Sequence, residues 1–391
     1  MLNLNETRHT GIKDAWAELV RSRPRLHQRE AADLLGISEA ALVASRCGDG
    51  AVRLQPKWRE ILAELPKVGT VKTITRNAHA VHETIGRYGG VSLAGDVAIV
   101  QSPDLDLRML LGAWASGYAL SENVASGPRW SVQFFDRNGT SVHKVFLEPD
   151  ADVGELMRIV GRFALSREDL ATAERVDSAA ASGNGATNAA AHRNGAGNGE
   201  ATGSARRNEA GFGAVTGSAA GDASAAIGAA LMQAWSELRD THDFLPMLAS
   251  HGVRRRQAMD IAEGGYTRNL GRDGLRRLLQ ALEGAGLPVM VFVSNPGCVQ
   301  IRTQAVTSVR VIGPWLNILD PTFNLHVMEA SIESTWVVEK PTSDGIVTAL
   351  EVYAHDGSEV LVMYGARKPG KAESPAWRAA IESLFATGDA Q

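Results

Sequence analysis

The sequence predicts an α+β protein built by tandem duplication, in which two copies of a unit of helices plus a large antiparallel sheet are joined by a disordered linker. In each half of the chain, helical segments are followed by short β-rich runs separated by turn residues. Matching residues recur in the two halves at one constant offset. A tract of small and polar residues interrupts the middle of the chain.

The constant offset indicates the duplication most directly. Asn77 matches Asn295 (295 − 77 = 218), and the turn at Asn138-Gly139 matches the turn at Asp356-Gly357 at the same offset of 218 residues. A register that holds over this distance without a gap indicates a repeated unit. Such a pair of units favours either a site where the two copies face each other or one site in each copy.

Residues 1–176 form the predicted N-terminal unit. Helices are expected over residues 12–46 and 56–66, because apolar residues recur there at helical spacing. From Val68 the pattern changes to that of strands, and Asp136-Arg-Asn-Gly139 between two β-rich runs is a strong hairpin signal. Residues 151–176 have a helical pattern again.

Residues 177–226 are the predicted linker and residues 227–391 the predicted C-terminal unit. The linker consists of Ala, Gly, Asn and Ser with scattered charge, which is too little apolar bulk to offset the entropy of the chain. In the C-terminal unit, helices are expected over about 227–249, 253–263, 273–284 and 374–386, and strands between 288 and 364.

Composition narrows the class of protein. The chain has 391 residues, 44% of them hydrophobic, and a formal net charge of −4, which argues against a surface built for nucleic acid. Its two cysteines, Cys47 and Cys298, give no disulfide framework and suit a reducing compartment. No signal peptide or membrane span is recognisable, so we expect a cytoplasmic protein without membrane insertion.

Common catalytic and binding motifs are absent or weak. The sequence has no phosphate-binding loop, dinucleotide-binding glycine pattern, nucleophile elbow or zinc-protease motif. His79 and His82 would share a face if helical but point to opposite sides if extended, and no third metal ligand lies near them. Residues 28–46 resemble a helix-turn-helix, so a ligand-responsive DNA-binding regulator is the alternative function. Glu39 and Ala40 of the second helix are poorly suited to base contacts. A helical hairpin packed on a domain explains the same pattern.

His242 is the main candidate ligand. It lies in Trp235–Leu248, where an apolar helical face meets acid and hydroxyl groups. A lone histidine is usually structural, but an iron porphyrin requires an axial imidazole, apolar walls and cations for two propionates, and this chain contains all three. The residues expected to complete such a pocket are Arg108, Arg255, Lys340, Tyr364 and Arg367.

Long motifs in both halves carry a resemblance to a known family. They are Val71–Glu83, Leu105–Arg108, Gln133–Val145, Gly297–Ile301, Gly313–His326 and Arg367–Gly370. These segments resemble the HemS/HmuS/ChuS/PhuS family of bacterial cytoplasmic hemin-transport and hemin-degrading proteins. The resemblance covers nearly the whole chain apart from residues 177–226 and the two ends.

The resemblance implies heme b (iron protoporphyrin IX) as the cofactor, in a cleft on the C-terminal half with part of the N-terminal half facing it. It implies His242 as the proximal iron ligand and Arg108 as the distal residue, which would be the catalytic one if heme is degraded. Arg255, Lys340, Tyr364 and Arg367 match family positions that line the pocket or contact propionates. Val362 departs from the family, because a glutamine is expected there.

The function implied is heme binding and trafficking in bacterial heme-iron uptake, with oxidative degradation that releases iron as an open question. Degradation would require an external electron donor, since much of that chemistry belongs to the cofactor. A heme-uptake transporter, a heme oxygenase and an electron-donor reductase are the partners implied. An interaction scaffold that binds no small molecule is a third hypothesis.

Overall fold

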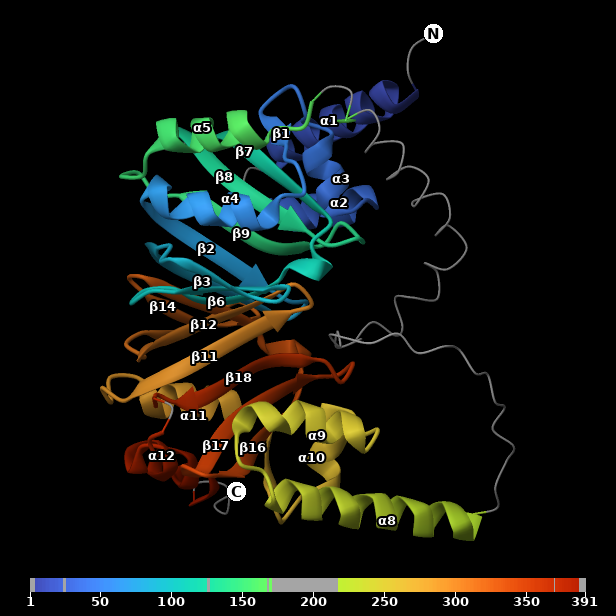
Figure 1. Ribbon diagram of the computed structural model, residues 1–391, viewed down its shortest axis with the longest axis vertical. Helices are drawn as coiled ribbons and strands as arrows, with labels where there is room; N and C mark the ends of the chain where they lie inside the picture. The colour runs from blue at the N-terminus through green and yellow to red at the C-terminus, as the bar shows by residue number, and fades with distance from the viewer. Residues whose placement is uncertain are drawn as a thin grey trace. The chain divides into compact units, whose positions relative to one another are not determined.

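Each half of the chain runs through the same succession of elements (Figure 1). In the first half they are α1 (Leu4–Ser22), α2 (Gln28–Leu35), α3 (Glu39–Ala44), β1 (Ala51–Arg53), α4 (Trp58–Glu64), η1 (Leu65–Val68), β2 (Thr70–Arg76), β3 (Ala80–Arg87), β4 (Val91–Ala94), β5 (Val97–Gln101), β6 (Asp106–Leu110), η2 (Leu111–Ala113), β7 (Ser116–Val124), β8 (Gly127–Phe135), β9 (Ser141–Leu147) and α5 (Val153–Phe163).

The second half repeats the series. Its elements are α8 (Gly217–Ser236), η3 (Thr241–Asp243), α9 (Phe244–Ser250), α10 (Arg255–Ile261), β10 (Thr267–Gly271), α11 (Gly274–Leu282), β11 (Pro288–Asn295), β12 (Cys298–Ala305), β13 (Val309–Ile312), β14 (Trp315–Asp320), β15 (Phe323–Met328), η4 (Glu329–Ser331), β16 (Ile332–Thr342), β17 (Gly345–Ala354), β18 (Glu359–Gly365) and α12 (Pro375–Ala386). The strands β2 and β11 begin at Thr70 and Pro288, 218 residues apart, which confirms the duplication.

The structure, a computed structural model, describes residues 4–23, 26–124, 127–166, 169–170, 217–368 and 370–386. The chain forms two units. Unit 1 consists of Met1–Gly195, Val293–Arg302 and Pro321–Leu325, and unit 2 of Ala196–Phe292, Thr303–Asp320 and His326–Gln391. Unit 1 therefore contains two short segments from the second half of the sequence.

Unit 1 uses both of these segments as strands. Among the strands with residues in unit 1, the hydrogen-bonded order is β1-β7-β8-β9-β2-β3-β15 in one antiparallel sheet and β4-β5-β6-β12 in the other. The contact of β12 with β6 runs from Cys298 opposite Met109 to Ile301 opposite Asp106. At the other segment, the backbone N–H of Ile85 donates to the carbonyl of Thr322 at 2.9 Å.

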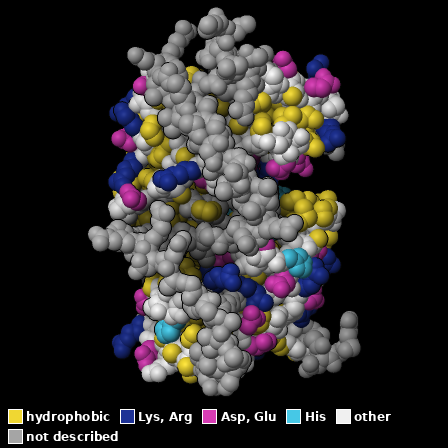
Figure 2. All heavy atoms as spheres, turned by 90° about the vertical axis from the view of Figure 1, so that its right-hand side faces the viewer, with side chains coloured by type: hydrophobic (Ala, Val, Ile, Leu, Met, Phe, Trp, Pro, Cys, Tyr) yellow, Lys and Arg dark blue, Asp and Glu magenta, His cyan; other side chains and the backbone are white. Residues whose placement is uncertain are grey.

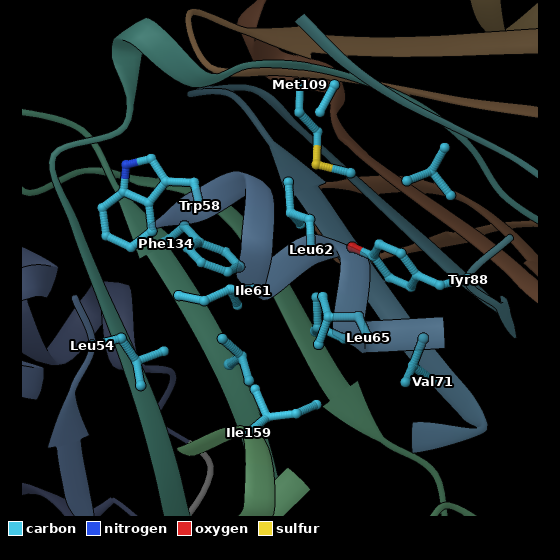
Figure 3. Close-up of a cluster of buried hydrophobic side chains, with 14 of the residues drawn as sticks. Leu54, Trp58, Ile61, Leu62, Leu65, Val71, Tyr88, Met109, Phe134 and Ile159 are labelled. Carbon is cyan, nitrogen blue, oxygen red and sulfur yellow. The ribbon is translucent and has the colours of Figure 1, made fainter. Parts of the chain in front are cut away.

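The core of unit 1 lies between its strands and the helices α4 and α5. Figure 3 shows Trp58, Ile61 and Leu62 of α4 pointing toward Phe134 of β8. The indole of Trp58 meets the Phe134 ring edge-on, with ring centroids 5.8 Å apart. This cluster buries the side chains that the helical and strand patterns direct to one side.

Unit 2 has the same plan. Its main antiparallel sheet has the order β10-β16-β17-β18-β11, and β13 pairs with β14. Helices α8, α9 and α10 pack through one buried cluster against residues of β16, β17 and β18, including Trp336, Ala349 and Val362. Helix α11 contacts β16, and α12 contacts α11 and β18. The corner between α8 and α9, which carries His242, therefore packs against the sheet.

The secondary structure corrects several sequence expectations. The helix expected over 227–249 is two helices, α8, which ends at Ser236, and α9, which begins at Phe244, with η3 between them. Helix α8 begins at Gly217, ten residues before the expected start. Within the stretch 151–176 expected to be helical, α5 ends at Phe163, after which Ala164 bridges to Leu54, and residues 171–176 lie outside the described residues. Residues 177–216 of the expected linker lie outside the described residues.

The patterns also missed strands whose residues are poor strand formers. Strand β7 is Ser-Gly-Tyr-Ala-Leu-Ser-Glu-Asn-Val, in which small and polar residues hide the period of two. The hairpin expected at Asp136-Arg-Asn-Gly139 is present, with Gly139 at φ 74°, where its carbonyl accepts from Ala40 at 3.0 Å. No helix in the part of the chain described here is long and apolar enough to cross a membrane.

Candidate functional site

His242 occupies a short 3₁₀ turn, η3, at the corner between α8 and α9. Its side chain is 93% exposed. Asp240 caps the turn, and its Oδ1 accepts from the backbone N–H of His242 at 2.8 Å and contacts the ring Nδ1 at 2.6 Å. Because a carboxylate only accepts, Nδ1 carries the hydrogen, and the lone pair of the imidazole is on Nε2. No hydrogen bond reaches Nε2 from any residue that the structure describes.

Phe244 anchors the corner two residues further along the chain. It is 1% exposed and meets the indole of Trp235 edge-on at 4.7 Å between centroids. The Nζ of Lys340 lies 4.4 Å from the centre of the Phe244 ring, and the indole N–H of Trp235 donates to the carbonyl of Glu339 at 2.9 Å. The face of an aromatic ring attracts a cation electrostatically. Both contacts come from residues of β16, so β16 holds this end of the corner.

The other end of the corner is tied to the turn between β16 and β17. The carbonyl of Arg239 accepts from the backbone N–H of Ser343 at 2.9 Å and from its hydroxyl at 3.1 Å. The next residue, Asp344, accepts from Arg367 Nη1 at 3.3 Å and from the backbone N–H of Gly370 at 3.0 Å. Arg367 and the His242 corner therefore share one supporting turn.

A buried ion cluster lies on the same face of the sheet. Glu351 is 0% exposed, and its carboxylate receives two hydrogen bonds from Arg255, at 2.7 and 2.8 Å. Lys340 Nζ donates to Glu351 at 2.9 Å and to the Tyr364 hydroxyl at 3.0 Å. Arg255 also donates to Glu359 at 2.5 Å. Two cations and two carboxylates leave this cluster without net charge.

The electrostatics of the cluster follow from burial and pairing. Burial opposes ionisation of Glu351, but Arg255 and Lys340 outweigh it and hold the pKa of this carboxyl well below its usual range. Burial likewise works against the charge of Lys340, yet Glu351 and then Tyr364 raise its pKa above the ordinary value. Glu351, Arg255 and Lys340 are therefore all charged at neutral pH.

Strand register explains how distant residues meet here. Glu351 lies opposite Val362 of β18 and Trp336 of β16, and Ala349 lies opposite Tyr364. Side chains two apart on a strand share a face, so Glu351, Val362 and Tyr364 point to the side covered by α8, α9 and α10. Val362, where the family resemblance implied a glutamine, is 4% exposed in the apolar part of this face.

Arg108 belongs to unit 1, whereas the other five residues selected from the sequence belong to unit 2. It is on β6, opposite Ile99 of β5 and Val299 of β12. Its guanidinium pairs with the carboxylate of Asp106 on the same strand, and its side chain is 33% exposed. Within unit 2, Arg255 and Lys340 converge on Glu351, and Tyr364 joins them by accepting from Lys340. Arg367 joins the corner through Asp344.

Sequence reasoning missed the acidic members of this site. Glu351 stands inside the apolar strand Thr348–Ala354, and a charged residue in such a run signals a buried ion pair. Phe244 was visible only as an apolar residue. Asp240 caps the 3₁₀ turn, and its bond to the imidazole ring depends on a side-chain geometry that the sequence does not specify.

The histidine pair in the first half does not form a metal site. His82 is on β3, fully buried, with its ring centroid 4.8 Å from that of Phe323. His79 precedes the strand, and its backbone N–H is held by Asn77 at 2.9 Å. Over the described ranges, no group of three His, Cys, Asp or Glu side chains is arranged to hold a metal ion.

The two helices α2 and α3 are the hairpin that the sequence left as the alternative to a DNA reader. Glu39, Leu42 and Val43 of α3 are buried, so the helix that would enter a groove packs into its own unit. Figure 2 shows acidic and basic side chains interspersed on the visible face, with no single basic patch among the described residues.

Comparison with known proteins places these features in a family. The family model of the haemin-degrading HemS.ChuX domain matches the chain twice, at residues 36–163 and 252–384. The hemin transport protein HmuS of Yersinia pestis is 33% identical over 369 residues, which is 93% of this chain and 94% of that protein. The hemin transport protein HemS of Yersinia enterocolitica is 32% identical over 380 residues, 95% of this chain and 97% of that protein.

Solved structures agree with the sequence matches. Holo-PhuS, a heme-binding protein from Pseudomonas aeruginosa, is 37% identical and superposes with a TM-score of 0.80 over 96% of this chain and 98% of its own. ChuS, an E. coli heme oxygenase, is 33% identical, with a TM-score of 0.76 over 96% of this chain and 99% of its own. None of these relatives supports the alternative hypothesis of a DNA-binding regulator. The chain belongs to the family of haemin-degrading HemS.ChuX-domain proteins.

Proposed function

We propose that this protein binds heme b and moves it within the bacterial cell, with His242 as the axial ligand. The proposal rests on the exposed imidazole of His242. Its Nδ1–H donates a hydrogen bond to Asp240, and the lone pair of its Nε2 is available to bind iron. A neutral imidazole held in one tautomer by a second group is the usual form of a histidine that binds a metal. The names of the relatives HmuS, HemS and PhuS support heme as the ligand.

The residues of unit 2 fit this ligand in part. Tyr364, which is partly buried beside the apolar cluster, is a wall of the kind that a porphyrin ring requires, whereas Phe244 and Val362 are buried within the cluster and support it. Arg255 and Lys340 are fully committed to Glu351 and Glu359, so we assign them to holding the site rather than to supplying net charge for propionates. Arg367, whose only carboxylate partner among the described residues is the 25%-exposed Asp344, is the better propionate partner.

Bound heme supplies the capacity to activate dioxygen, and the protein's contribution is to hold and surround it. His242 would hold the iron through its Nε2, and Asp240 would keep the ring oriented. Arg108, which belongs to unit 1, stays a prediction that rests on the family resemblance. Whether the protein carries heme or degrades it then depends on an external electron donor.

Hemin titration tests the ligand assignment. We expect a saturable one-to-one change of the Soret band in the wild type and its loss or displacement in His242→Ala. His355→Ala is the matched control, because His355 is also exposed in unit 2 but lies in the turn between β17 and β18. An unchanged spectrum and affinity in His242→Ala would remove His242 as the ligand.

Reduction in air separates the two forms of the function. With catalase present, loss of the Soret band and appearance of a bilin-like product would establish oxidative degradation. A stable reduced complex that passes its heme to a heme oxygenase would establish carriage. We propose the cytoplasm as the compartment, since the two cysteines form no disulfide. A heme-uptake transporter and an electron-donor reductase are the partners that this pathway requires.

A further inference from the structure

A single oxygen atom joins the backbone and the ring of the candidate ligand. Oδ1 of Asp240 accepts from the backbone N–H of His242 at 2.8 Å and from its ring Nδ1 at 2.6 Å, and the Thr241 hydroxyl lies 3.5 Å away. The backbone and the ring of His242 therefore share one acceptor atom.

Capping alone does not account for this arrangement. A cap needs only the bond to the backbone N–H, which Asn, Ser or Thr at position 240 would also provide. The next acidic residue, Asp243, begins α9 without any side-chain cap bond. The ring contact is shorter than the backbone contact and engages the nitrogen opposite the one that is free to bind a metal.

We propose that Asp240 is a positioning residue that sets the strength of His242 as a ligand, a role that rests on the proposed function. A carboxylate that accepts the Nδ1 hydrogen fixes the ring as the tautomer with a free Nε2 lone pair. It also raises the basicity of Nε2, because the negative charge draws the shared hydrogen away from the ring. A more basic ligand stabilises ferric iron relative to ferrous iron.

The exposure of Asp240 and His242 to water determines whether their interaction is stronger in the ligand-free or in the bound protein. Asp240 is 58% and His242 93% exposed, so water weakens their interaction in the ligand-free protein. A flat ligand on Nε2 covers the imidazole and removes part of this water. The contact between Asp240 and the ring therefore strengthens on binding, and its contribution belongs to the bound state rather than to folding.

The test compares three variants of the full chain. Asp240→Asn keeps a cap and removes the charge, Asp240→Ala removes both, and Asp243→Asn removes a neighbouring charge that makes no bond to the ring. In the ligand-free protein, nitrogen NMR of the imidazole reports the tautomer. In the hemin complex, an absorption titration reports affinity, and spectroelectrochemistry reports the ferric–ferrous midpoint potential.

We expect the wild type to show the Nδ1–H tautomer and Asp240→Asn to lose its predominance. Hemin affinity should fall about 10- to 100-fold in Asp240→Asn, the range typical of losing a partner of a metal-bound histidine, and the midpoint potential should rise. Asp243→Asn should match the wild type in all three measurements. A loss confined to Asp240→Ala would show that Asp240 is only a cap.

Two outcomes separate this inference from the proposed function. Wild-type affinity and potential in Asp240→Asn, with His242→Ala still defective, would overturn the role of Asp240 and leave His242 as the ligand. Absence of hemin binding in the wild type would overturn the proposed function. In that case the tautomer measurement still tests the contact between Asp240 and the His242 ring by itself. An Nε2–H tautomer in the wild type would overturn that contact.

Discussion

The ammonium group of Lys340 lies 4.4 Å from the centre of the Phe244 ring and 2.9 Å from the carboxylate of Glu351. This contact links the buried ion cluster of the sheet to the corner that carries His242. It gives the charged residues a structural role, because they support the helix start that follows the candidate ligand.

Replacing Glu351 should be among the most destabilising changes in unit 2. Glu351→Gln leaves Arg255 and Lys340 buried with one fewer negative charge, so the free energy of unfolding should fall by about 3–5 kcal/mol. Urea denaturation measures it. Asp260→Asn breaks the exposed pair with Arg256 and should cost at most about 1 kcal/mol. Equal effects of the two variants would contradict the cluster's importance.

Phe244→Leu tests the contact between the cluster and the corner. Leucine keeps the site apolar but removes the aromatic face, so about 1–2 kcal/mol of attraction to Lys340 should be lost and hemin affinity should fall. Phe385→Leu is the control, since Arg268 lies 4.2 Å from the centre of its ring on α12. It should change hemin binding little. Wild-type hemin affinity in Phe244→Leu would show that the corner does not depend on this contact.

Arg367 and Asp344 should affect hemin affinity in opposite directions. Arg367→Gln removes the proposed propionate partner, so affinity should fall about tenfold or more, as for loss of a charge-assisted hydrogen bond. Asp344→Asn releases Arg367 from its carboxylate while keeping an acceptor for the Gly370 N–H, so affinity should rise. Absorption titration measures both. A decrease in both variants would indicate that the turn, rather than the free guanidinium, matters.

The core of unit 1 should give the protein a marked dependence of stability on pH. His143 is fully buried, hydrogen bonded to Tyr88 at 2.6 Å and to Thr75 at 3.0 Å, and burial lowers its pKa to about 3. The unfolded chain has the ordinary histidine pKa of about 6.5 and binds the proton first. The stability contributed by the neutral ring is therefore present above about pH 6.5 and lost as the pH falls toward 3.

This dependence amounts to about 5 kcal/mol if the shift of the His143 pKa acts alone. His143→Gln has no titrating ring, so its free energy of unfolding should vary less between pH 6.5 and 4 than that of the wild type. The exposed His355→Gln should keep the wild-type profile. Parallel profiles for the wild type and His143→Gln would exclude the ring as the source.

The sequence predicted the duplicated architecture because the two halves share spacing and turn chemistry. Asn138-Gly139 and Asp356-Gly357 form matching turns, and each has its glycine at positive φ. It did not predict that Val293–Arg302 joins unit 1, because strand pairing between distant segments leaves no local pattern.

The candidate site was predictable in its cations but not in their partners. His242, Arg255, Lys340 and Tyr364 were selected by residue type and by family resemblance. The placement of Lys340 and Tyr364 beside Glu351 depends on the register of three strands, which brings Lys340 and Glu351 together from eleven residues apart. The consequence, a neutral cluster in place of free positive charge, emerges only from that register.

Chemical rescue of the ligand tests the central claim most directly. His242→Gly removes an exposed ring from a corner whose two anchors, the carbonyl of Arg239 and the ring of Phe244, remain. Free imidazole added to the hemin complex of this variant should restore the wild-type Soret band and should leave the wild-type complex unchanged. A wild-type spectrum in His242→Gly without imidazole would contradict His242 as the iron ligand.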